Sequence, residues 1–503
     1  MSRIICISNR VSLPNPQTGT IKAGGLAVGV KAALEANGGG VWFGWDGTVC
    51  KANRQKRRIT KIQHDDITFL TIPLTETEYE HYYKKMANEN LWPLMHELGE
   101  HIEGSASSYG IYKCVNRMFA RLLKPYLKPD DLLWVHDYHL IPLGRELRTL
   151  GVNNRIGYFH HIPMPSEDFL NSRAVPAFLN KQYERLFEDL SAYDLVGFQS
   201  FRDFENFESC LSSDVYKPKR YESTSVRLCG SKTHFGVFPI SVETADLIRQ
   251  AREKKDQDAA LASEKDRYRV LIGAERLDYT KGLANRLEGF FEFLQRYPDY
   301  QKKIKYHQIT PLSRGDIRQY KQTIEKIRRA AGKIHNEYAD ESWQPLAYRE
   351  EGMPREQLMG SFRHSDIGLV TPLIDGQNLV AKEYLAVQDP CDPGLLILSK
   401  NAGAAEELEN LGVLCVDPYD TGEIADKINE ALRMPRLQRI ERHQRILSHL
   451  YQFDIEHWAE SFLDEMAKTR KEETIIHYGQ NFGAIAKSGV WARSDSAPHR
   501  FFL

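Results

Sequence analysis

A chain of 503 residues is too long for one hydrophobic core, and its length predicts two or three domains. Its 42% hydrophobic and 27% charged residues are typical of ordinary globular proteins. The 67 basic and 68 acidic residues leave a formal net charge of −1, so neither a nucleic acid nor an anionic membrane is indicated as a partner.

The seven cysteines are scattered, and none forms a CxxC pair. Some lie in apolar runs such as Ile4–Ile7, which predicts buried thiols in a reducing compartment rather than disulfides or a zinc site. The N-terminus leads directly into a strand-like run. No apolar stretch is as long as the about 18 residues that a membrane-spanning helix needs. We therefore expect a cytoplasmic protein.

Short apolar runs alternate with helical patterns along the whole chain. The predicted strands of the first half are RIICIS, VWFGW, FLTIPL, DLLWVH, RIGYFHHIP, DLVGFQ and FGVFPI. Those of the second half are YRVLIGAE, IKYHQI, DIGLV, GLLIL and GVLCV. This alternation predicts an α/β fold with parallel sheets that are covered by helices.

A charged segment with few large apolar residues, 241–266, separates the two series. We therefore expect two Rossmann-like domains, 1–240 and 241–455, that face each other across a cleft. An amphipathic helix over 456–471 is expected to cross back to the N-terminal domain. The tail 472–503 loses periodicity, and we expect it to be disordered at least in part.

Ligands of open α/β sheets bind beyond the carboxyl ends of the strands. The glycine-rich segment 23–29 could offer backbone N–H groups to an anion there, although a structural turn explains it equally well. Asp137 follows the run DLLWVH, and His160 and His161 follow RIGYF. One such histidine suits a structural role, but two such loops in neighbouring units favour a site.

The second half collects cations at the same kind of position. Arg276 and Lys281 follow a predicted strand directly, and Arg314 follows the next one. A guanidinium and an ammonium at a strand–helix junction suit a diphosphate, whereas a surface turn with salt bridges is the alternative.

Two acids stand eight residues apart, Asp375 on a loop and Glu383 in the following helix, with backbone N–H groups of 378–380 between them. Paired carboxylates can hydrolyse a glycoside. Because these acids share an edge with cations and helix N–H groups, the favoured interpretation is a sugar nucleotide. Its phosphates would contact the cations, and its hydroxyls would contact the acids.

The ordered motifs of the chain resemble those of the trehalose-6-phosphate synthase family, retaining glycosyltransferases of the GT-B fold (glycosyltransferase family 20). The resemblance spans about residues 3–468 and is carried by ISNR, AGGLAVG, WFGW, LWP, VHDYHL, HIPMP, GFQ, ERLDYTKG, SRGD, DGQNLVAKEY and AGAAEE. It implies transfer of glucose from UDP-glucose to glucose 6-phosphate, which gives α,α-trehalose 6-phosphate for trehalose biosynthesis and osmoprotection.

The resemblance also implies the site residues. The donor-binding set is Gly25, Arg276, Lys281, Asp375, Asn378, Leu379, Val380 and Glu383. The acceptor-binding set is Arg10, Trp45, Tyr83, Trp92, Asp137 and Arg314. The catalytic set is Arg276, Lys281, His161 and Asp137.

Within these sets each residue has an implied task. Arg276 and Lys281 would hold the diphosphate, Glu383 the ribose, and Asp375 with Asn378 the glucose. On the acceptor side Arg10, Tyr83 and Arg314 would bind the phosphate. Asp137 would contact acceptor hydroxyls, and His161 would lie beside the reacting centre.

The implied mechanism is a front-face attack in which the leaving diphosphate takes the acceptor proton. Arg276 and Lys281 would stabilise the developing charge where other enzymes use a metal, so we expect no metal or other cofactor. Small-molecule substrates are the expected partners, and a homo-oligomer is compatible with the sequence.

Some positions depart from the family pattern. They are 95–99, 108–112, His160, Gln377 and Asn401. These departures leave open a related transferase with another phosphorylated acceptor, such as a glucosylglycerol-phosphate synthase or a pseudo-glycosyltransferase, and UDP, GDP and ADP all remain open as the nucleotide. A non-catalytic sugar-phosphate sensor or regulatory subunit is a further alternative, but it would be expected to lose some of the donor-side charges, all of which are present.

Overall fold

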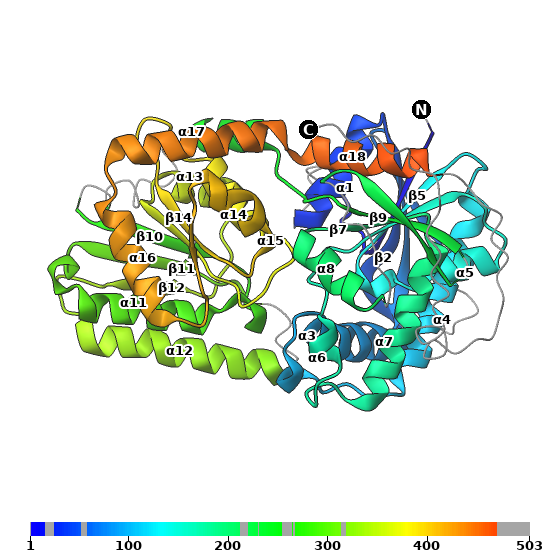
Figure 1. The fold of residues 1–503 in the computed structure, drawn as a ribbon, viewed down its shortest axis with the longest axis horizontal. Helices are drawn as coiled ribbons and strands as arrows, with labels where there is room; N and C mark the ends of the chain where they lie inside the picture. Colours follow the sequence, from blue (N-terminus) through cyan, green and yellow to red (C-terminus); the bar gives the residue numbers. More distant parts are fainter. Residues whose placement is uncertain are drawn as a thin grey trace, which may run out of the picture. The chain divides into compact units, whose positions relative to one another are not determined.

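The computed structural model describes residues 2–15, 25–51, 58–211, 220–229, 231–253, 264, 267–312 and 318–469 (Figure 1). The chain divides into two compact units. Unit 1 comprises Met1–Phe238 and Trp458–Leu503, and unit 2 comprises Pro239–His457. The tail 472–503 lies outside the described residues, as do residues 52–57, most of the basic run KANRQKRR at 51–58.

Unit 1 contains a nine-stranded sheet in the order β3-β4-β2-β1-β5-β6-β7-β9-β8. Its strands are β1 (Ile4–Arg10), β2 (Gly40–Cys50), β3 (Thr60–His64), β4 (Ile67–Thr75), β5 (Leu132–His136), β6 (Arg155–Phe159), β7 (Leu195–Phe198), β8 (Ser223–Leu228) and β9 (Ser231–Val237). The inner pairings are parallel, whereas β3 and β8 add antiparallel edges.

The helices of unit 1 connect the parallel strands. They are α1 (Gly25–Ala36), α2 (Glu76–Glu78), the π-helix η2 (Tyr79–Leu91), α3 (Trp92–Met95), α4 (Ser108–Leu123), α5 (Leu143–Thr149), α6 (Glu167–Leu170), α7 (Ala177–Asp189) and α8 (Phe201–Ser209). A π-helix is a rare element that is often found at functional positions.

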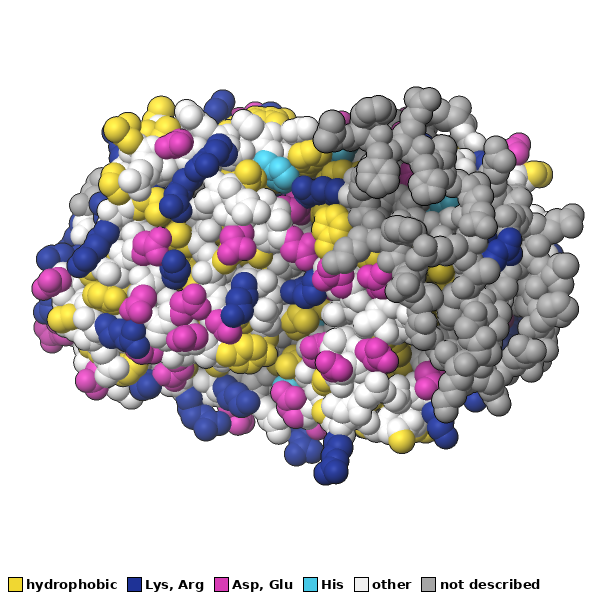
Figure 2. Space-filling model, viewed as in Figure 1, with side chains coloured by type: hydrophobic (Ala, Val, Ile, Leu, Met, Phe, Trp, Pro, Cys, Tyr) yellow, Lys and Arg dark blue, Asp and Glu magenta, His cyan; other side chains and the backbone are white. Residues whose placement is uncertain are grey.

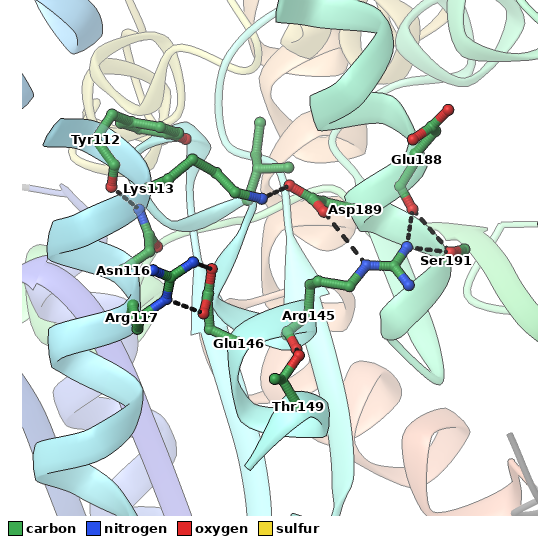
Figure 3. A network of polar contacts seen from close by, with 12 residues as sticks. Tyr112, Lys113, Asn116, Arg117, Arg145, Glu146, Thr149, Glu188, Asp189 and Ser191 are labelled. Atoms are coloured by element: carbon green, nitrogen blue, oxygen red, sulfur yellow. Dashed lines mark hydrogen bonds and ion pairs between the residues drawn. The ribbon is translucent and has the colours of Figure 1, made fainter. Parts of the chain in front are cut away.

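Ion pairs fasten α4, α5 and the end of α7 together (Figure 3). The buried carboxylate of Asp189 accepts hydrogen bonds from Lys113 Nζ at 2.6 Å and from Arg145 Nε at 3.3 Å. Arg117 Nε donates to Glu146 at 3.0 Å in the same region. Burial raises the pKa of Asp189, and the two cations beside it oppose that rise.

Unit 2 contains a six-stranded sheet in which every pairing among the described strands is parallel. Its strands are β10 (Arg269–Ala274), β11 (Ile304–Ile309), β12 (Leu346–Arg349), β13 (Ile367–Val370), β14 (Leu395–Ser399) and β15 (Leu414–Val416), in the order β12-β11-β10-β13-β14-β15. This is the doubly wound order, which places a ligand-binding crevice where the chain reverses between β10 and β13.

Helices cover both faces of this sheet. They are α9 (Thr244–Glu253), α11 (Leu283–Arg296), α12 (Arg318–Tyr338), α13 (Arg355–Arg363), α14 (Leu379–Ala386), α15 (Gly403–Leu408), α16 (Thr421–Arg433) and α17 (Arg436–Gln452). Helix α11 packs against α12 and α16 (Figure 1). Helix α14 packs against α9, α13 and α17. The predicted α/β fold of two Rossmann-like units is confirmed.

The last described helix, α18 (Ile455–Lys468), begins in unit 2 and continues as part of unit 1. Its Trp458 and Phe462 rings each lie 5.0 Å from the ring of Trp134 on β5. A Cβ added to Gly157 or Gly197 would come within 2.8 Å of Phe462. The helix therefore packs closely on unit 1 because glycines on β6 and β7 leave room for its aromatic face.

Three strands were not predicted from the sequence. β3 and β8 are edge strands with polar sequences, TKIQH and STSVRL, so they lack the apolar run of a buried strand. β12 has only four residues, LAYR. The expectation of buried thiols holds for Cys6, whereas Cys114 and Cys391 are exposed, and all seven cysteines are free.

The described surface carries charges of both signs. Figure 2 shows Lys and Arg side chains interspersed with Asp and Glu on the face in view. Among the described residues no helix is both long and apolar enough to span a membrane.

Buried histidines stand at the carboxyl ends of β5 and β6. His136 is completely buried, and burial lowers its pKa to about 3. Burial also lowers the pKa of His160 to about 4, although its Nε2 lies 3.2 Å from the carbonyl of Pro163. Its Nδ1 lies 3.0 Å from the hydroxyl of Tyr158. Both rings are therefore neutral in the folded protein at pH 7.

These histidines predict a fall in stability on acidification. The folded pKa of His160 lies below the ordinary value of 6.5, so the unfolded chain binds the proton first, and stability falls as pH drops below about 6.5. Between pH 7 and pH 5, His160→Gln is expected to reduce the loss in unfolding free energy by about 2 kcal/mol, measured by urea denaturation.

Tyr158→Phe is the matched control, because it removes the same hydrogen bond but leaves the buried imidazole. It is expected to lower stability and to keep the wild-type pH dependence. Equal pH dependence in wild type and His160→Gln would contradict this assignment.

Candidate active site

In unit 1 the acceptor-side candidates lie at one edge of the sheet. Register aligns Arg10 at the end of β1 with Trp45 on β2. It also aligns the ends of β5 and β6, His136 with Phe159. Asp137 and His161 follow these strand ends closely, so parallel pairing brings their loops to the edge that carries Arg10.

Arg10, Trp45 and Tyr83 form a cluster. The guanidinium carbon of Arg10 lies 5.7 Å from the Trp45 ring centroid, a cation–π distance. The Tyr83 ring lies 5.4 Å from the Trp45 ring. Gly47 beside this cluster has φ 88°, a backbone conformation that favours glycine, and a Cβ there would come within 2.6 Å of the Arg10 guanidinium. The cluster therefore holds a cation among aromatic rings, which suits a phosphate ester.

Two aromatic residues that the sequence analysis did not assign connect Tyr83 to Trp92. His139 lies under Tyr83 with a centroid distance of 6.1 Å and an interplanar angle of 13°. Tyr138 is 4.0 Å from His139 and 5.9 Å from Trp92. Both lie within the VHDYHL motif, so the position after a predicted strand was the available signal. Tyr83, His139, Tyr138 and Trp92 thus form one continuous series of packed aromatic rings.

Asp137 has an unusual backbone conformation, with φ 76° and ψ 165°. A positive φ is costly for a residue with a Cβ, and such strain concentrates at functional sites. Its N–H donates to the carbonyl of Phe159 at 2.8 Å, and its Oδ1 accepts the N–H of His161 at 3.3 Å. These bonds hold the carboxylate at the edge of the sheet beside His161.

His161 is held by two side chains. Its Nε2 lies 3.1 Å from His136 Nδ1, and its Nδ1 lies 3.2 Å from Gln199 Nε2. Burial, together with the neighbouring His136 and His160, lowers the pKa of His161 well below its ordinary value. The imidazole is therefore neutral, which suits hydrogen bonding rather than proton donation.

In unit 2 the donor-side candidates gather at the ends of β10 and β13. Lys281 Nζ donates to Asp375 Oδ2, and Asn378 Nδ2 donates to the same oxygen at 3.0 Å. The turn that carries Lys281 approaches β13 closely, because Gly282 has φ 61° and a Cβ there would lie 2.2 Å from the carbonyl of Thr371. Lys281 and Asp375, which the sequence predicted as a cation and an acid of the site, are thus in direct contact.

The charge state of Lys281 follows from these neighbours. Burial favours the neutral amine, but the carboxylates of Asp375 and Glu275 outweigh it and raise the pKa of Lys281. The ammonium therefore persists well above neutral pH, as an anion-binding group requires.

A buried ion pair that the sequence analysis missed supports this cluster. Glu275 Oε1 accepts from Asn378 Nδ2 at 2.9 Å, and Glu275 Oε2 pairs with Arg286. Arg286 Nε also donates to Thr371 Oγ1 at 3.0 Å. Glu275 immediately precedes Arg276, but a single acid in a loop carries no signal that it is buried. Through Glu275, the ion pair holds the side chain of Asn378 in place.

Asn378 is the second candidate with a strained backbone, φ 75° and ψ 87°, and it is the N-cap of α14. Its side chain accepts the N–H of Ala381 at 3.3 Å. The N–H groups of Leu379 and Val380 belong to the first turn of α14, where no intrahelical acceptor exists. This turn can bind an anion.

Glu383 and Arg276 complete the edge. Arg355 Nη2 donates to Glu383 Oε1 at 2.7 Å. Burial raises the pKa of Glu383, and Arg355 opposes the rise. The Arg276 side chain is 48% exposed, and its guanidinium lies 3.9 Å from Asp278.

Two predicted residues add little structural information. Gly25 begins α1, whereas Gly24 lies outside the described residues. Arg314 also lies outside them. Within the described part of the chain, no group of three or more His, Cys, Asp or Glu residues is placed to hold a metal ion.

The sequence profile of glycosyltransferase family 20 matches residues 5–468. A trehalose-6-phosphate synthase of Escherichia coli O1:K1 / APEC is 40% identical over 467 residues, which cover 93% of this chain and 95% of that protein.

Solved structures give the same result. An α,α-trehalose-phosphate synthase (UDP-forming) from Burkholderia xenovorans, in complex with glucose-6-phosphate, superposes with a TM-score of 0.86 at 34% identity and covers 92% of this chain and 100% of that chain. An E. coli structure bound with UDP-2-fluoro glucose has a TM-score of 0.85 at 39% identity, covering 94% and 100% of the two chains. The chain belongs to glycosyltransferase family 20 and has its GT-B fold.

Proposed function

We propose that the protein is a retaining glucosyltransferase that moves glucose from UDP-glucose to glucose 6-phosphate and forms α,α-trehalose 6-phosphate. Unit 2 binds the donor, and unit 1 binds the acceptor. The observation that carries the proposal is the cluster at the ends of β10 and β13, where Lys281 and Asn378 share one oxygen of Asp375.

The donor side supplies each kind of group that a sugar nucleotide needs. Lys281, Arg276 and the first turn of α14 present positive charge and N–H donors to the diphosphate. Asp375 accepts hydrogen bonds from glucose hydroxyls, and Glu383 accepts them from the ribose. These roles are supported by the position of all these groups at one edge of the unit 2 sheet.

The acceptor side supplies a phosphate site and an apolar wall. The Arg10 guanidinium, held by Trp45, pairs with the 6-phosphate, and the Tyr83 hydroxyl adds a hydrogen bond. Trp92 lines the sugar position, and Asp137 contacts its hydroxyls. The two solved relatives described above contain glucose-6-phosphate and UDP-2-fluoro glucose, respectively, which supports this pair of substrates.

The proposed chemistry needs no carboxylate nucleophile. The acceptor hydroxyl attacks from the face that the diphosphate leaves, and a diphosphate oxygen takes its proton. Arg276 and Lys281 stabilise the negative charge that develops on the diphosphate as the glycosidic bond breaks. We assign this role to the two cations rather than to a metal ion. His161, neutral and hydrogen bonded, lies beside Asp137 and helps to orient the reacting sugar.

The direct test crosses donors with acceptors. Purified protein is incubated with UDP-, GDP- or ADP-glucose and with glucose 6-phosphate or glycerol 3-phosphate, and nucleoside diphosphate release is measured. UDP-glucose with glucose 6-phosphate is expected to give the highest kcat/KM, and NMR is expected to show an α,α linkage in the product.

Turnover with glycerol 3-phosphate alone would replace the proposed acceptor. Binding of glucose 6-phosphate without turnover of any donor would instead indicate a sugar-phosphate sensor.

Arg276 offers a clean test of diphosphate stabilisation because its side chain is half exposed. Arg276→Ala is expected to lower kcat by about 100-fold or more, while the unfolding free energy changes by no more than about 0.5 kcal/mol. Arg328→Ala is the matched control, since this exposed arginine pairs with Glu350 on the surface of unit 2. Near-wild-type kcat in Arg276→Ala would refute the assigned role.

Arg10 tests the acceptor phosphate. Arg10→Ala is expected to raise KM for glucose 6-phosphate on the order of 10- to 100-fold, because a charge-assisted contact is lost, and to leave KM for UDP-glucose unchanged. With glucose as acceptor, the same variant is expected to behave like the wild type. Arg121→Ala, which changes an exposed arginine in the last turn of α4 in unit 1, is the control. An equal loss with both acceptors would contradict a phosphate contact.

A further inference from the structure

Three side chains from separate parts of unit 2 lie within hydrogen-bond distance of the buried carboxylate of Glu407 on α15. Lys382 Nζ donates to Glu407 Oε1 at 2.9 Å, and Gln377 Nε2 donates to the same oxygen. His449 Nε2 lies 3.1 Å from Glu407 Oε2. The Lys382 side chain is fully buried, and the Glu407 side chain is 4% exposed.

One of these partners belongs to the loop that carries the donor-side residues. Gln377 lies between Asp375 and Asn378, and its amide nitrogen must face Glu407 because a carboxylate only accepts hydrogen bonds. The loop is also bound to the start of α15, where Gly403 N–H donates to the carbonyl of Asp375 at 3.1 Å. A Cβ on Gly403 would come within 1.9 Å of the loop backbone, so the contact is close.

The other two partners, Lys382 and His449, connect Glu407 to the two segments where the chain passes from one unit to the other. Lys382 Nζ donates to the carbonyl of Ile240 at 2.8 Å, two residues after the first crossing at 238–239. His449 lies on α17, which leads to the second crossing at 457–458. The two crossing segments also bind each other, since Ile455 N–H donates to the carbonyl of Val242 at 3.2 Å.

We propose that Glu407 is a positioning residue for the donor loop, and that through Lys382, His449 and Gln377 it couples this loop to both chain crossings. A buried ion pair is a poor source of stability, because desolvation of two charges offsets their attraction. Its value lies in direction: Lys382 Nζ and the amide nitrogen of Gln377 both reach Glu407 only when the loop, α14 and α15 keep one arrangement.

The proposal rests on the function assigned to the Asp375 loop. Donor binding there changes the hydrogen bonds of Asp375 and Asn378, which flank Gln377. Since Gln377 and Lys382 share one oxygen of Glu407, a shift of the loop alters the lysine that binds Ile240. The coupling thus connects the donor site with the two segments through which unit 2 continues into unit 1.

Hydrogen–deuterium exchange without and with UDP tests the coupling. In the wild type, UDP is expected to slow exchange at 375–381 and also at 241–244 and 450–457. In Gln377→Met, which removes the amide but leaves the ion pair, slowing at the loop is expected to persist, and slowing at both crossings to fall by half or more. An unchanged response at the crossings would overturn the proposal.

Kinetics distinguish positioning from a merely structural role. Gln377→Met is expected to lower kcat about tenfold while KM for UDP-glucose stays within about twofold, because the loop still binds but is misplaced. His449→Phe, which keeps the ring against Phe453, is expected to have a similar effect. If both act through Glu407, the double variant is no worse than the more impaired single one; fully additive losses would refute a shared path.

An arm without UDP separates this proposal from the assigned function. Glu407→Gln is expected to speed exchange at 241–244 and 450–457 at least fivefold. Asp189→Asn, which removes the charge of a similar buried carboxylate bound by a lysine in unit 1, is the control and is expected to leave those segments unchanged. If the protein neither binds UDP nor releases it from UDP-glucose, but the two variants differ in exchange at the crossings, the proposed function is wrong and the coupling is supported. If the two variants exchange alike at the crossings, the coupling fails.

Discussion

The proposed donor-binding edge of unit 2 depends on ion pairs that neutralise its charged side chains. Lys281 contacts Asp375, Arg355 contacts Glu383, and Arg286 contacts Glu275. Cations brought together to hold a diphosphate would repel one another if each lacked a carboxylate nearby. Asp375, which accepts sugar hydroxyls in the proposed function, therefore also stabilises Lys281, which holds the diphosphate.

The backbone carries part of the same task. Asp137 in unit 1 and Asn378 in unit 2 both have positive φ angles, although neither is glycine. Each is held by hydrogen bonds: Asp137 to the backbones of Phe159 and His161, and Asn378 to Glu275, Asp375 and Ala381. Strain of this kind persists only where the surrounding structure determines it. In both units a strained residue presents a polar side chain at the carboxyl edge of a parallel sheet.

Much of the fold could be predicted because buried parallel strands read as apolar runs. Runs such as DLLWVH and YRVLIGAE coincide with β5 and β10, and loops that follow them carry Asp137 and Arg276. Edge strands β3, β8 and β12 could not be found, since a strand with little burial needs no apolar pattern. The same limit hid Glu275, Arg286 and Glu407, because an isolated charge in a sequence does not show whether it is buried or what neutralises it.

By itself the sequence determined the α/β class and the order of the motifs that match glycosyltransferase family 20. It also supplied the residue types available at each strand end, from Arg10 to Glu383. Only the tertiary structure decided which of them meet. Lys281 and Asp375 are 94 residues apart and share a contact, as do Gln377 and Glu407 at a separation of 30 residues. The physical reason is that parallel pairing and the close approaches at Gly282 and Gly403 are set by packing between distant segments, which no local pattern encodes.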